Sequence, residues 1–248
     1  KIKDIQQFQR EGNAWVLNLA HQFEGKFEAD EDAFDVAVEI FGRFLKHKKP
    51  HNGGFIWTDE LKAISLSPET FLVQESDHLQ TFPIKGTGTK ESLQENEKEQ
   101  AELQMITDLM RNDLGQICTA VKVLQERVLE DQKDFYHSYS VIEGTLKDKK
   151  LTWEAYKKLL PAGSISGAPK KRVVEKIIET ESFQRNFYTG TFGVRLSPEY
   201  SLWGILIRTM FFEDKHWKLP VGAGITVDSN PQQEWHETLQ KAKSCLNL

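Results

Sequence analysis

The chain has few of the residues that mark secreted, membrane-bound or nucleic-acid-binding proteins. Its two cysteines, Cys118 and Cys245, show neither metal-site nor redox spacing, so we expect a cytoplasmic protein in a reducing compartment. No apolar run is long enough to span a membrane, and the net charge of -5 argues against a nucleic-acid or membrane-surface partner. Repeats, low-complexity tracts and Pro/Ser-rich linkers are also missing, which favours one compact domain over residues 1–248.

Apolar periodicity predicts strands and helices that do not alternate in a βαβ rhythm. The strands cluster into meanders with helices between the clusters, which favours an α+β fold with mostly antiparallel sheets. We expect strands at 14–20, 54–57, 62–66, 70–73, 187–196 and 201–212, helices at 31–46, 91–110, 152–161, from Pro169 and from about Gln232, and turns at 111–115 and 222–225. The apolar face of the first helix is expected to carry Phe34, Val38, Phe41 and Leu45.

Lys85 lies between a proline that fixes one backbone dihedral and a glycine that frees another, in the segment Pro83-Ile-Lys-Gly86. This pattern predicts a shaped turn that holds the lysine in place. Glu69, sixteen residues earlier, would lie on a neighbouring strand or turn. A lysine beside a carboxylate can be tuned by burial to act as a nucleophile, with the acid as its proton partner. The alternative is a solvent-facing loop lysine.

Two pairs of glutamates lie three residues apart on predicted helices. Glu99 and Glu102 share one helix, and Glu234 and Glu237 share the last one, so each pair faces one side of its helix. Opposed across a cleft, the four carboxylates would form a hard-cation site. Mg²⁺ suits them because it favours oxygen ligands and keeps waters for a substrate. The alternative for either pair alone is a solvated helix surface.

Three features are typical of anion binding but also have ordinary structural explanations. The segment 164–169 leads into a helix N-terminus, whose free N–H groups either favour a carboxylate or phosphate or belong to a capped helix. Gly222 and Gly224 either bring backbone amides close to an anion or form a turn. Arg208 interrupts an apolar strand, so it is half of an internal ion pair or a carboxylate clamp.

Three more polar residues have a structural role as their first explanation. His137 and Tyr188 lie on predicted strands, where such residues are more often satisfied core groups than ligands. Lys241 follows Glu237 by four residues, which predicts a salt bridge on the helix surface. None of the three indicates a site by itself.

Taken in chain order, these segments resemble the chorismate-utilising enzymes, the family of anthranilate, isochorismate, salicylate and aminodeoxychorismate synthases. The resemblance spans about residues 10 to 246, and so many motifs in the family's order make chance similarity a poor explanation. The matching stretches are Ser67-Pro-Glu69, Pro83-Ile-Lys-Gly-Thr87, the run from Glu102 to Asp113, Gly163 to Lys170, Ile207-Arg-Thr209, Gly222 to Ile225, Asp228-Ser229 and Glu234 to Lys241.

The resemblance implies an α+β fold of two large, mostly antiparallel sheets packed together with helices outside and the active site between them. Within the family, lysine in place of alanine in the motif Pro-Ile-x-Gly-Thr is typical of aminodeoxychorismate synthase component I. The reaction so implied is the Mg²⁺-dependent amination of chorismate at C4, a transferase step toward p-aminobenzoate and folate. The product is 4-amino-4-deoxychorismate.

Residue roles follow from the same resemblance. Lys85 would attack C2 of chorismate while the C4 hydroxyl leaves, and ammonia would then add at C4 and expel the lysine. Glu69 matches the general acid and base. The resemblance further implies that Glu102 and Glu237 bind Mg²⁺ while Glu99 and Glu234 hold its waters, that Arg208, Tyr188, Gly222 and Gly224 bind the enolpyruvyl carboxylate, and that Lys241, His137 and Ser166 line the active site.

Ammonia would come from a separate glutamine amidotransferase subunit, as the resemblance implies. Neither cysteine of the chain lies in a Gly-rich elbow followed by a histidine and an acid, the arrangement that glutamine hydrolysis needs. Val16 stands where hydroxylating members of the family carry a water-activating lysine, which argues against isochorismate or salicylate chemistry.

Two other functions remain open at the level of sequence. One is an anthranilate synthase-like large subunit, which Lys85 disfavours. The other is a catalytically silent homologue that only binds chorismate or a partner, which the retained lysine and carboxylates disfavour. Family members are usually longer at the N-terminus, and this chain opens Lys1-Ile2-Lys3 without methionine, so we expect a shortened N-terminus.

Overall fold

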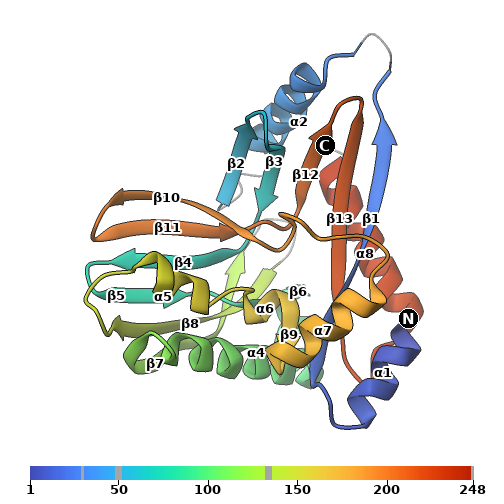
Figure 1. Ribbon diagram of the computed structural model, residues 1–248. Helices are drawn as coiled ribbons and strands as arrows, with labels where there is room; N and C mark the ends of the chain where they lie inside the picture. The colour runs from blue at the N-terminus through green and yellow to red at the C-terminus, as the bar shows by residue number, and fades with distance from the viewer. Residues whose placement is uncertain (29–30, 48–51, 132–135, 247–248) are drawn as a thin grey trace. The chain divides into compact units, whose positions relative to one another are not determined.

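The computed structural model describes residues 1–28, 31–47, 52–131 and 136–246 (Figure 1). The chain forms two compact units, each assembled from separate stretches of sequence. Unit 1 comprises Lys1–Pro68, Ser166–Gly190 and Ile205–Leu248, and unit 2 comprises Glu69–Ile165 and Thr191–Gly204. Among the described residues, no helix has the length and apolarity needed to cross a membrane.

Unit 1 contains a six-stranded sheet in the order β2-β3-β12-β13-β1-β9. All its pairings are antiparallel, and the longest joins β1 to β13. The strands are β1 (Val16–Lys26), β2 (Asn52–Trp57), β3 (Lys62–Ser67), β9 (Gly167–Ala168), β12 (Thr209–Glu213) and β13 (His216–Ile225).

Four helices belong to unit 1: α1 (Ile2–Arg10), α2 (Ala33–His47), α7 (Lys170–Thr180) and α8 (Pro231–Leu246). Helices α1 and α7 pack on β1 and β13 through a cluster that includes Ile5, Leu17 and Val173. Helices α2 and α8 meet the sheet through a second cluster, which includes Phe44 and Ala242. Burial of these apolar side chains holds the helices against the sheet.

The apolar face predicted for α2 is confirmed only at Phe41, which packs against the sheet clusters. Phe34, Val38 and Leu45 are exposed, whereas Ala37 and Phe44 are buried against the sheet. The helix carries apolar residues on two overlapping stripes, so periodicity alone does not choose between them. The small side chain of Ala37 lets the helix backbone approach Ile64 and Met210, which settles the choice.

Unit 2 contains a seven-stranded sheet in the order β10-β11-β4-β5-β8-β6, with β7 paired to β8. Strand β8 (Tyr136–Leu146) pairs antiparallel with β5, β6 and β7 and organises this half of the unit. The other strands are β4 (Thr70–Glu75), β5 (His78–Thr81), β6 (Ile84–Gly88), β7 (Cys118–Asp131), β10 (Thr191–Ser197) and β11 (Tyr200–Ile205). The helices are α3 (Lys90–Glu95), α4 (Glu97–Gly115), α5 (Trp153–Lys158) and α6 (Gly163–Ser166). The last residue of α6, Ser166, is the first residue of the second stretch of unit 1.

The α+β prediction with antiparallel sheets is confirmed, and so are several element ends. Thr152 caps α5 by accepting a hydrogen bond from the N–H of Ala155 at 3.2 Å, and Pro169 directly precedes α7. The predicted turn at 111–115 is wrong, because α4 continues to Gly115. The predicted strand 201–212 is two strands, since the chain leaves unit 2 after β11 and enters unit 1 as β12.

Candidate active site

Lys85 projects from a bulge in β6. Ile84 pairs with Tyr139 of β8 and Thr87 pairs with His137, so β6 carries one more residue than its partner over this stretch. A bulge of this kind bends the strand and redirects the side chain at the extra residue. Gly86 follows with φ of +91°, a conformation that glycine adopts without strain. The lysine therefore lies on a bulged strand instead of the predicted turn.

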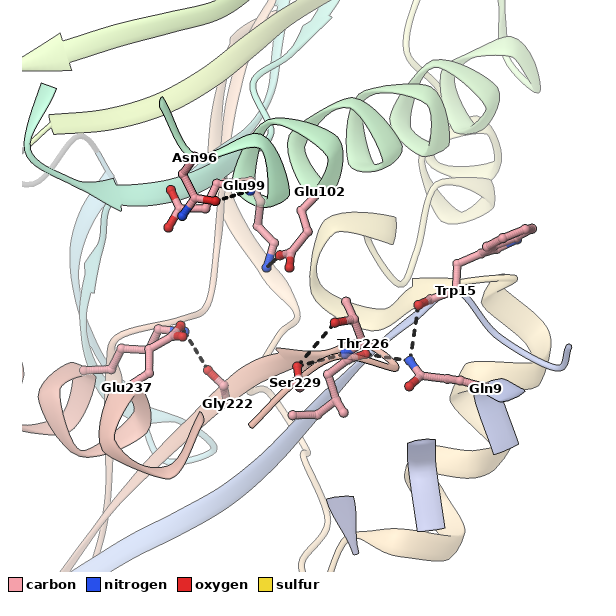
Figure 2. Close-up of polar contacts among 12 residues, drawn as sticks. Gln9, Trp15, Asn96, Glu99, Glu102, Gly222, Thr226, Ser229 and Glu237 are labelled. Atoms are coloured by element: carbon pink, nitrogen blue, oxygen red, sulfur yellow. Dashed lines mark hydrogen bonds and ion pairs between the residues drawn. The ribbon is translucent and has the colours of Figure 1, made fainter. Parts of the chain in front are cut away.

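Gly86 is also needed because helix α4 approaches the bulge closely. A Cβ atom at this position would lie 2.7 Å from Oε2 of Glu99 and 2.9 Å from Cδ2 of Leu93. The side chain of Asn96 caps α4 by accepting a hydrogen bond from the N–H of Glu99 at 3.2 Å (Figure 2). Because this cap fixes the start of α4, the first turn of the helix places Glu99 against β6.

Lys85 forms an ion pair with Glu102, the other member of the glutamate pair on α4. The distance from Nζ to Oε2 is 2.8 Å, and the two side chains are 27% and 15% exposed. Such a contact between part-buried groups is stronger than a surface ion pair because solvent screens it less. The reading of Lys85 as a solvent-facing loop residue is therefore wrong.

Glu69 is buried at the start of unit 2, directly before β4. Its Oε1 accepts a hydrogen bond of 2.9 Å from the hydroxyl of Ser164 on α6. A buried carboxylate needs such donors, since burial without them disfavours its charged form. His137, on β8 opposite Thr87, is buried as well, as predicted for a strand residue.

Arg208 lies in unit 1, between β11 and β12, in a left-handed conformation with φ of 50°. Its Nη1 donates to Oγ of Ser244 on α8 at 2.6 Å, and Ser244 in turn donates to the carbonyl of Lys241 at 2.7 Å. Among the described residues no carboxylate forms an ion pair with Arg208. Of the two sequence-level alternatives, the internal ion pair is thus disfavoured, and the guanidinium keeps its capacity to bind an anion.

Gly222 and Gly224 lie on β13 and do not form the predicted turn. They pair with Ala20 and Asn18 of β1 in a continuous antiparallel ladder. A Cβ atom at Gly222 would lie 2.5 Å from Oδ1 of Asn18 and 3.1 Å from the hydroxyl oxygen of Tyr188. The glycine is required here by the close approach of these side chains, which a sequence pattern alone cannot reveal.

Lys241 of α8 connects the helix to this strand. Its ammonium donates to the carbonyl of Gly222 at 2.8 Å (Figure 2) and lies 2.6 Å from Oε1 of Glu237. The predicted salt bridge is confirmed, and the second contact adds a link to β13. Glu237 is exposed and Glu234, one turn earlier, is half-buried.

Tyr188 is not on a strand, contrary to expectation. It lies in the turn between α7 and β10, and it is buried. Burial raises the pKa of its phenol well above the usual value, and the nearby Arg185 guanidinium opposes that rise. The hydroxyl therefore stays protonated and can donate a hydrogen bond at neutral pH. Ser166, also buried, is the last residue of α6.

Helix α1 supports the end of β13, a role that no sequence signal indicated. Nε2 of Gln9 donates to the carbonyls of Ile225 and Trp15, at 2.6 and 3.2 Å (Figure 2). The hydroxyl of Ser229 accepts from the N–H of Thr226 at 3.1 Å, which closes the turn that leads into α8. The bond from Gln9 to Ile225 joins residues 216 positions apart, so no local sequence pattern indicates it.

The glutamates suit a divalent cation by their chemistry. Glu99 and Glu102 present two part-buried carboxylates from one helix face of unit 2, and Mg²⁺ is commonly held by one or two carboxylates plus waters and substrate oxygens. In the described part of the chain, no three His, Cys, Asp or Glu side chains gather into a metal-binding group. The predicted site of four carboxylates, two from each unit, stays a prediction.

Comparison with known proteins gives one consistent result. The family model for chorismate binding enzymes matches residues 1–247. Aminodeoxychorismate synthase component 1 of Salmonella typhimurium is 32% identical over 260 residues, which is 100% of this chain and 56% of the relative. An anthranilate synthase component 1 of Haloarcula marismortui is 33% identical over 99% of this chain and 50% of the relative.

Solved structures agree. Anthranilate synthase component I of Streptococcus pneumoniae superposes with a TM-score of 0.86 at 30% identity, covering 98% of this chain and 56% of that one. The menaquinone-specific isochorismate synthase of Escherichia coli shares the fold, with a TM-score of 0.83 at 21% identity over 99% of this chain and 58% of that one. The chain spans about half the length of the curated relatives it matches. It belongs to the family of chorismate binding enzymes.

Proposed function

We propose that this chain aminates chorismate at C4 to give 4-amino-4-deoxychorismate, with Lys85 as a covalent nucleophile. The observation that carries the proposal is the placement of Lys85 on the β6 bulge, part-buried and 2.8 Å from Glu102. A lysine in full solvent would lack both the direction that the bulge imposes and the partial burial of this ion pair. Family membership and the aminodeoxychorismate synthases among the relatives support the same reaction.

The chemistry balances in two displacements. The neutral amine of Lys85 attacks C2, the ring double bonds shift, and the C4–O bond breaks with a proton from Glu69, which releases water. Ammonia then attacks C4, the double bonds shift back, and the C2–N bond breaks to return the lysine. Only a neutral amine can attack, so the lysine must lose its ammonium proton before the first step.

Glu69 fits the acid role because it is buried and accepts a hydrogen bond from the hydroxyl of Ser164. Burial favours the protonated form of a carboxyl group. A carboxyl group in this setting can carry the proton that the departing C4 hydroxyl needs.

Unit 1 would contribute the contacts to the enolpyruvyl carboxylate. Arg208 supplies a guanidinium with no ion pair among the described residues, Tyr188 supplies a protonated phenol, and Gly222 has no side chain to displace the Tyr188 hydroxyl. All three are donors or leave room for donors, which suits a carboxylate. Gly224, Lys241, His137 and Ser166 are proposed as the remaining contacts.

Mg²⁺ is the proposed cofactor, with Glu102 and Glu237 as ligands and Glu99 and Glu234 as holders of its waters. When bound, the ion would neutralise the ring carboxylate of chorismate. Glu102 would then have two positively charged partners, the metal and Lys85.

An anthranilate synthase-like activity is the second candidate, because several relatives carry that name. A chorismate-binding homologue without catalysis is the third. Several relatives are named component 1, which supports a partner subunit, and we propose a glutamine amidotransferase that supplies ammonia. We further propose that both occur in the cytoplasm, on the route to p-aminobenzoate and folate.

The deciding experiment is incubation of the purified chain with chorismate, Mg²⁺ and ammonium, followed by mass analysis of the products. Aminodeoxychorismate supports the proposal, anthranilate supports the second candidate, and unchanged chorismate supports the third. A parallel reaction with glutamine as the sole nitrogen source tests the partner, since the chain alone should then make no product.

A further inference from the structure

Beyond the end of β9, the backbone on that edge of β1 forms hydrogen bonds with side chains. The strand pairs with β13 from Leu17 to Lys26, but with β9 only at Val16 and Leu17. Beyond this point the N–H of Ala20 donates to Oε1 of Glu181 at 2.8 Å, and the carbonyl of Asn18 accepts from Nη2 of Arg185 at 2.7 Å. Two side chains thus replace the hydrogen bonds of a missing neighbour strand.

Glu181 and Arg185 also form a two-pronged ion pair with each other. Nη2 lies 2.6 Å from Oε1 and Nε lies 2.9 Å from Oε2, and the side chains are 2% exposed for the glutamate and 16% for the arginine. A buried pair of this geometry is directional, and removing one partner leaves the other as an uncompensated charge. The pair therefore fixes the residues that follow α7 to the edge of β1.

The guanidinium of Arg185 also contacts the turn that carries Tyr188. Its carbon lies 5.8 Å from the ring centroid of Tyr188, and Nη1 donates to the hydroxyl of Thr189 at 3.4 Å. Thr189 is a β-branched residue in the left-handed region, with φ of 62°, which is a strained conformation. Its N–H donates to the carbonyl of Leu206 at 2.9 Å. The hydrogen bonds with Arg185 and Leu206 together keep Thr189 in this conformation.

We propose that Glu181 and Arg185 are positioning residues for the carboxylate clamp, holding the Tyr188 hydroxyl beside Gly222. The expected effect on chorismate binding rests on the proposed function, whereas the effect on the position of Tyr188 does not. An ordinary surface ion pair contributes little and touches no functional residue. This pair instead is largely shielded from solvent, bonds to the edge of β1 and contacts the ring of Tyr188 and the hydroxyl of Thr189.

The test compares Arg185→Lys and Glu181→Gln with Tyr188→Phe and the double variant Arg185→Lys/Tyr188→Phe. Arg195→Lys is the matched control, because Arg195 also donates to backbone carbonyls, those of Leu151 and Pro198, but belongs to unit 2. Each protein is measured by amide hydrogen exchange without ligand, by chorismate affinity and by steady-state kinetics where turnover is present.

Arg185→Lys is expected to speed amide exchange at residues 186–190 by tenfold or more and to weaken chorismate binding about tenfold, with kcat changed less than KM. Lysine keeps the charge but cannot make the two-pronged contact. The double variant should bind chorismate within about twofold of Tyr188→Phe alone, since two residues that act through one hydroxyl are not additive. Arg195→Lys should leave residues 186–190 and chorismate binding unchanged.

Unchanged exchange at 186–190 in Arg185→Lys would overturn the proposal, and so would additive losses in the double variant. A parent protein that binds no chorismate would instead reject the proposed function. In that case the exchange measurement alone decides whether the pair positions Tyr188.

Discussion

The two units hold their candidate functional residues in different ways. In unit 2, Lys85, Glu99 and Glu102 lie on one strand and one helix that pack directly together, and the contact depends on a glycine at the bulge. In unit 1, Tyr188 and Arg208 lie outside the strands, next to or in left-handed backbone, and other side chains fix them. Regular elements thus hold Lys85, Glu99 and Glu102 of unit 2, whereas a network of side chains holds Tyr188 and Arg208 of unit 1.

This difference predicts different responses to mutation. A residue on regular elements is held by many small packing contacts, so a change to its own functional group should leave the rest intact. A residue held in a left-handed turn depends on a few specific hydrogen bonds, so a distant change can displace it. Substitutions in unit 2 and at the carboxylates of both units test this contrast.

The largest effect is expected for Lys85→Ala. If the lysine is the nucleophile, amination at C4 should fall by on the order of 10³-fold or more, because the covalent route is lost. Chorismate affinity should change only a few-fold, since the proposed carboxylate contacts belong to unit 1. Product formation and equilibrium binding are measured on the same preparation.

Lys157→Ala is the matched control for this experiment. Lys157 is also an ion-paired lysine of unit 2, with Nζ 2.7 Å from Oε1 of Glu154, but it lies on the exposed face of α5. It should keep the parent's rate. Amination by Lys85→Ala at the parent's rate would rule out the covalent route.

Local patterns in the sequence predicted much of unit 2. Thr152 marked the start of α5 because capping acts within one turn. The segment around Lys85 was recognised because Pro83 and Gly86 restrict the backbone at neighbouring positions. The motif did not reveal the ion pair with Glu102, since that contact joins residues seventeen apart through the packing of α4 on β6.

Unit 1 was harder to predict for the same physical reason. Gly222 and Gly224 resemble turn residues, but they are strand residues made necessary by Asn18 and Tyr188, which come from distant parts of the chain. Arg208 was expected inside a strand, whereas it occupies the break between two strands that belong to different units. No local pattern encodes a neighbour that only the folded chain supplies.

The next largest effect concerns the carboxylates. Glu102→Gln and Glu237→Gln should each raise the Mg²⁺ concentration for half-maximal activity by about tenfold or more, because each removes a charged oxygen ligand. Glu102→Gln should also free Lys85 from its ion pair. Glu154→Gln, which changes a surface glutamate of α5 paired with Lys157, is the control. Unchanged Mg²⁺ titrations in both site variants would reject the metal assignment.

A structural test of unit 2 is Gly86→Ala. The free energy of unfolding should fall by about 2–4 kcal/mol, since alanine is strained at φ of +91° and its methyl group would meet Glu99 and Leu93. Denaturant unfolding followed by tryptophan fluorescence measures the loss.

Gly115→Ala provides the comparison, because a Cβ atom at Gly115, the last residue of α4, meets nothing within 4 Å. That variant should change the free energy of unfolding by less than about 1 kcal/mol. Equal effects at the two glycines would mean that α4 does not approach the bulge closely.

The smallest effect is expected for the alkaline stability of unit 2, through Tyr156. Burial raises the pKa of its phenol to about 12, while its hydrogen bond with Thr191 acts in the opposite direction. Because the folded pKa lies above the unfolded value of 10, the proton stabilises the folded state fully below pH 10, and this contribution is lost between pH 10 and 12. Two pKa units correspond to roughly 2–3 kcal/mol.

Tyr156→Phe should therefore lose less free energy of unfolding between pH 10 and 12 than the parent. The variant starts from a lower free energy of unfolding because it lacks the bond to Thr191. Trp203, whose ring centroid lies 4.6 Å from that of Tyr156, reports the transition by fluorescence. Tyr200→Phe, at a more exposed tyrosine of β11, should keep the parent's pH dependence. If Tyr156→Phe loses as much stability as the parent between pH 10 and 12, the alkaline sensitivity arises elsewhere in the chain, and the buried Tyr188 of unit 1 becomes the next residue to test.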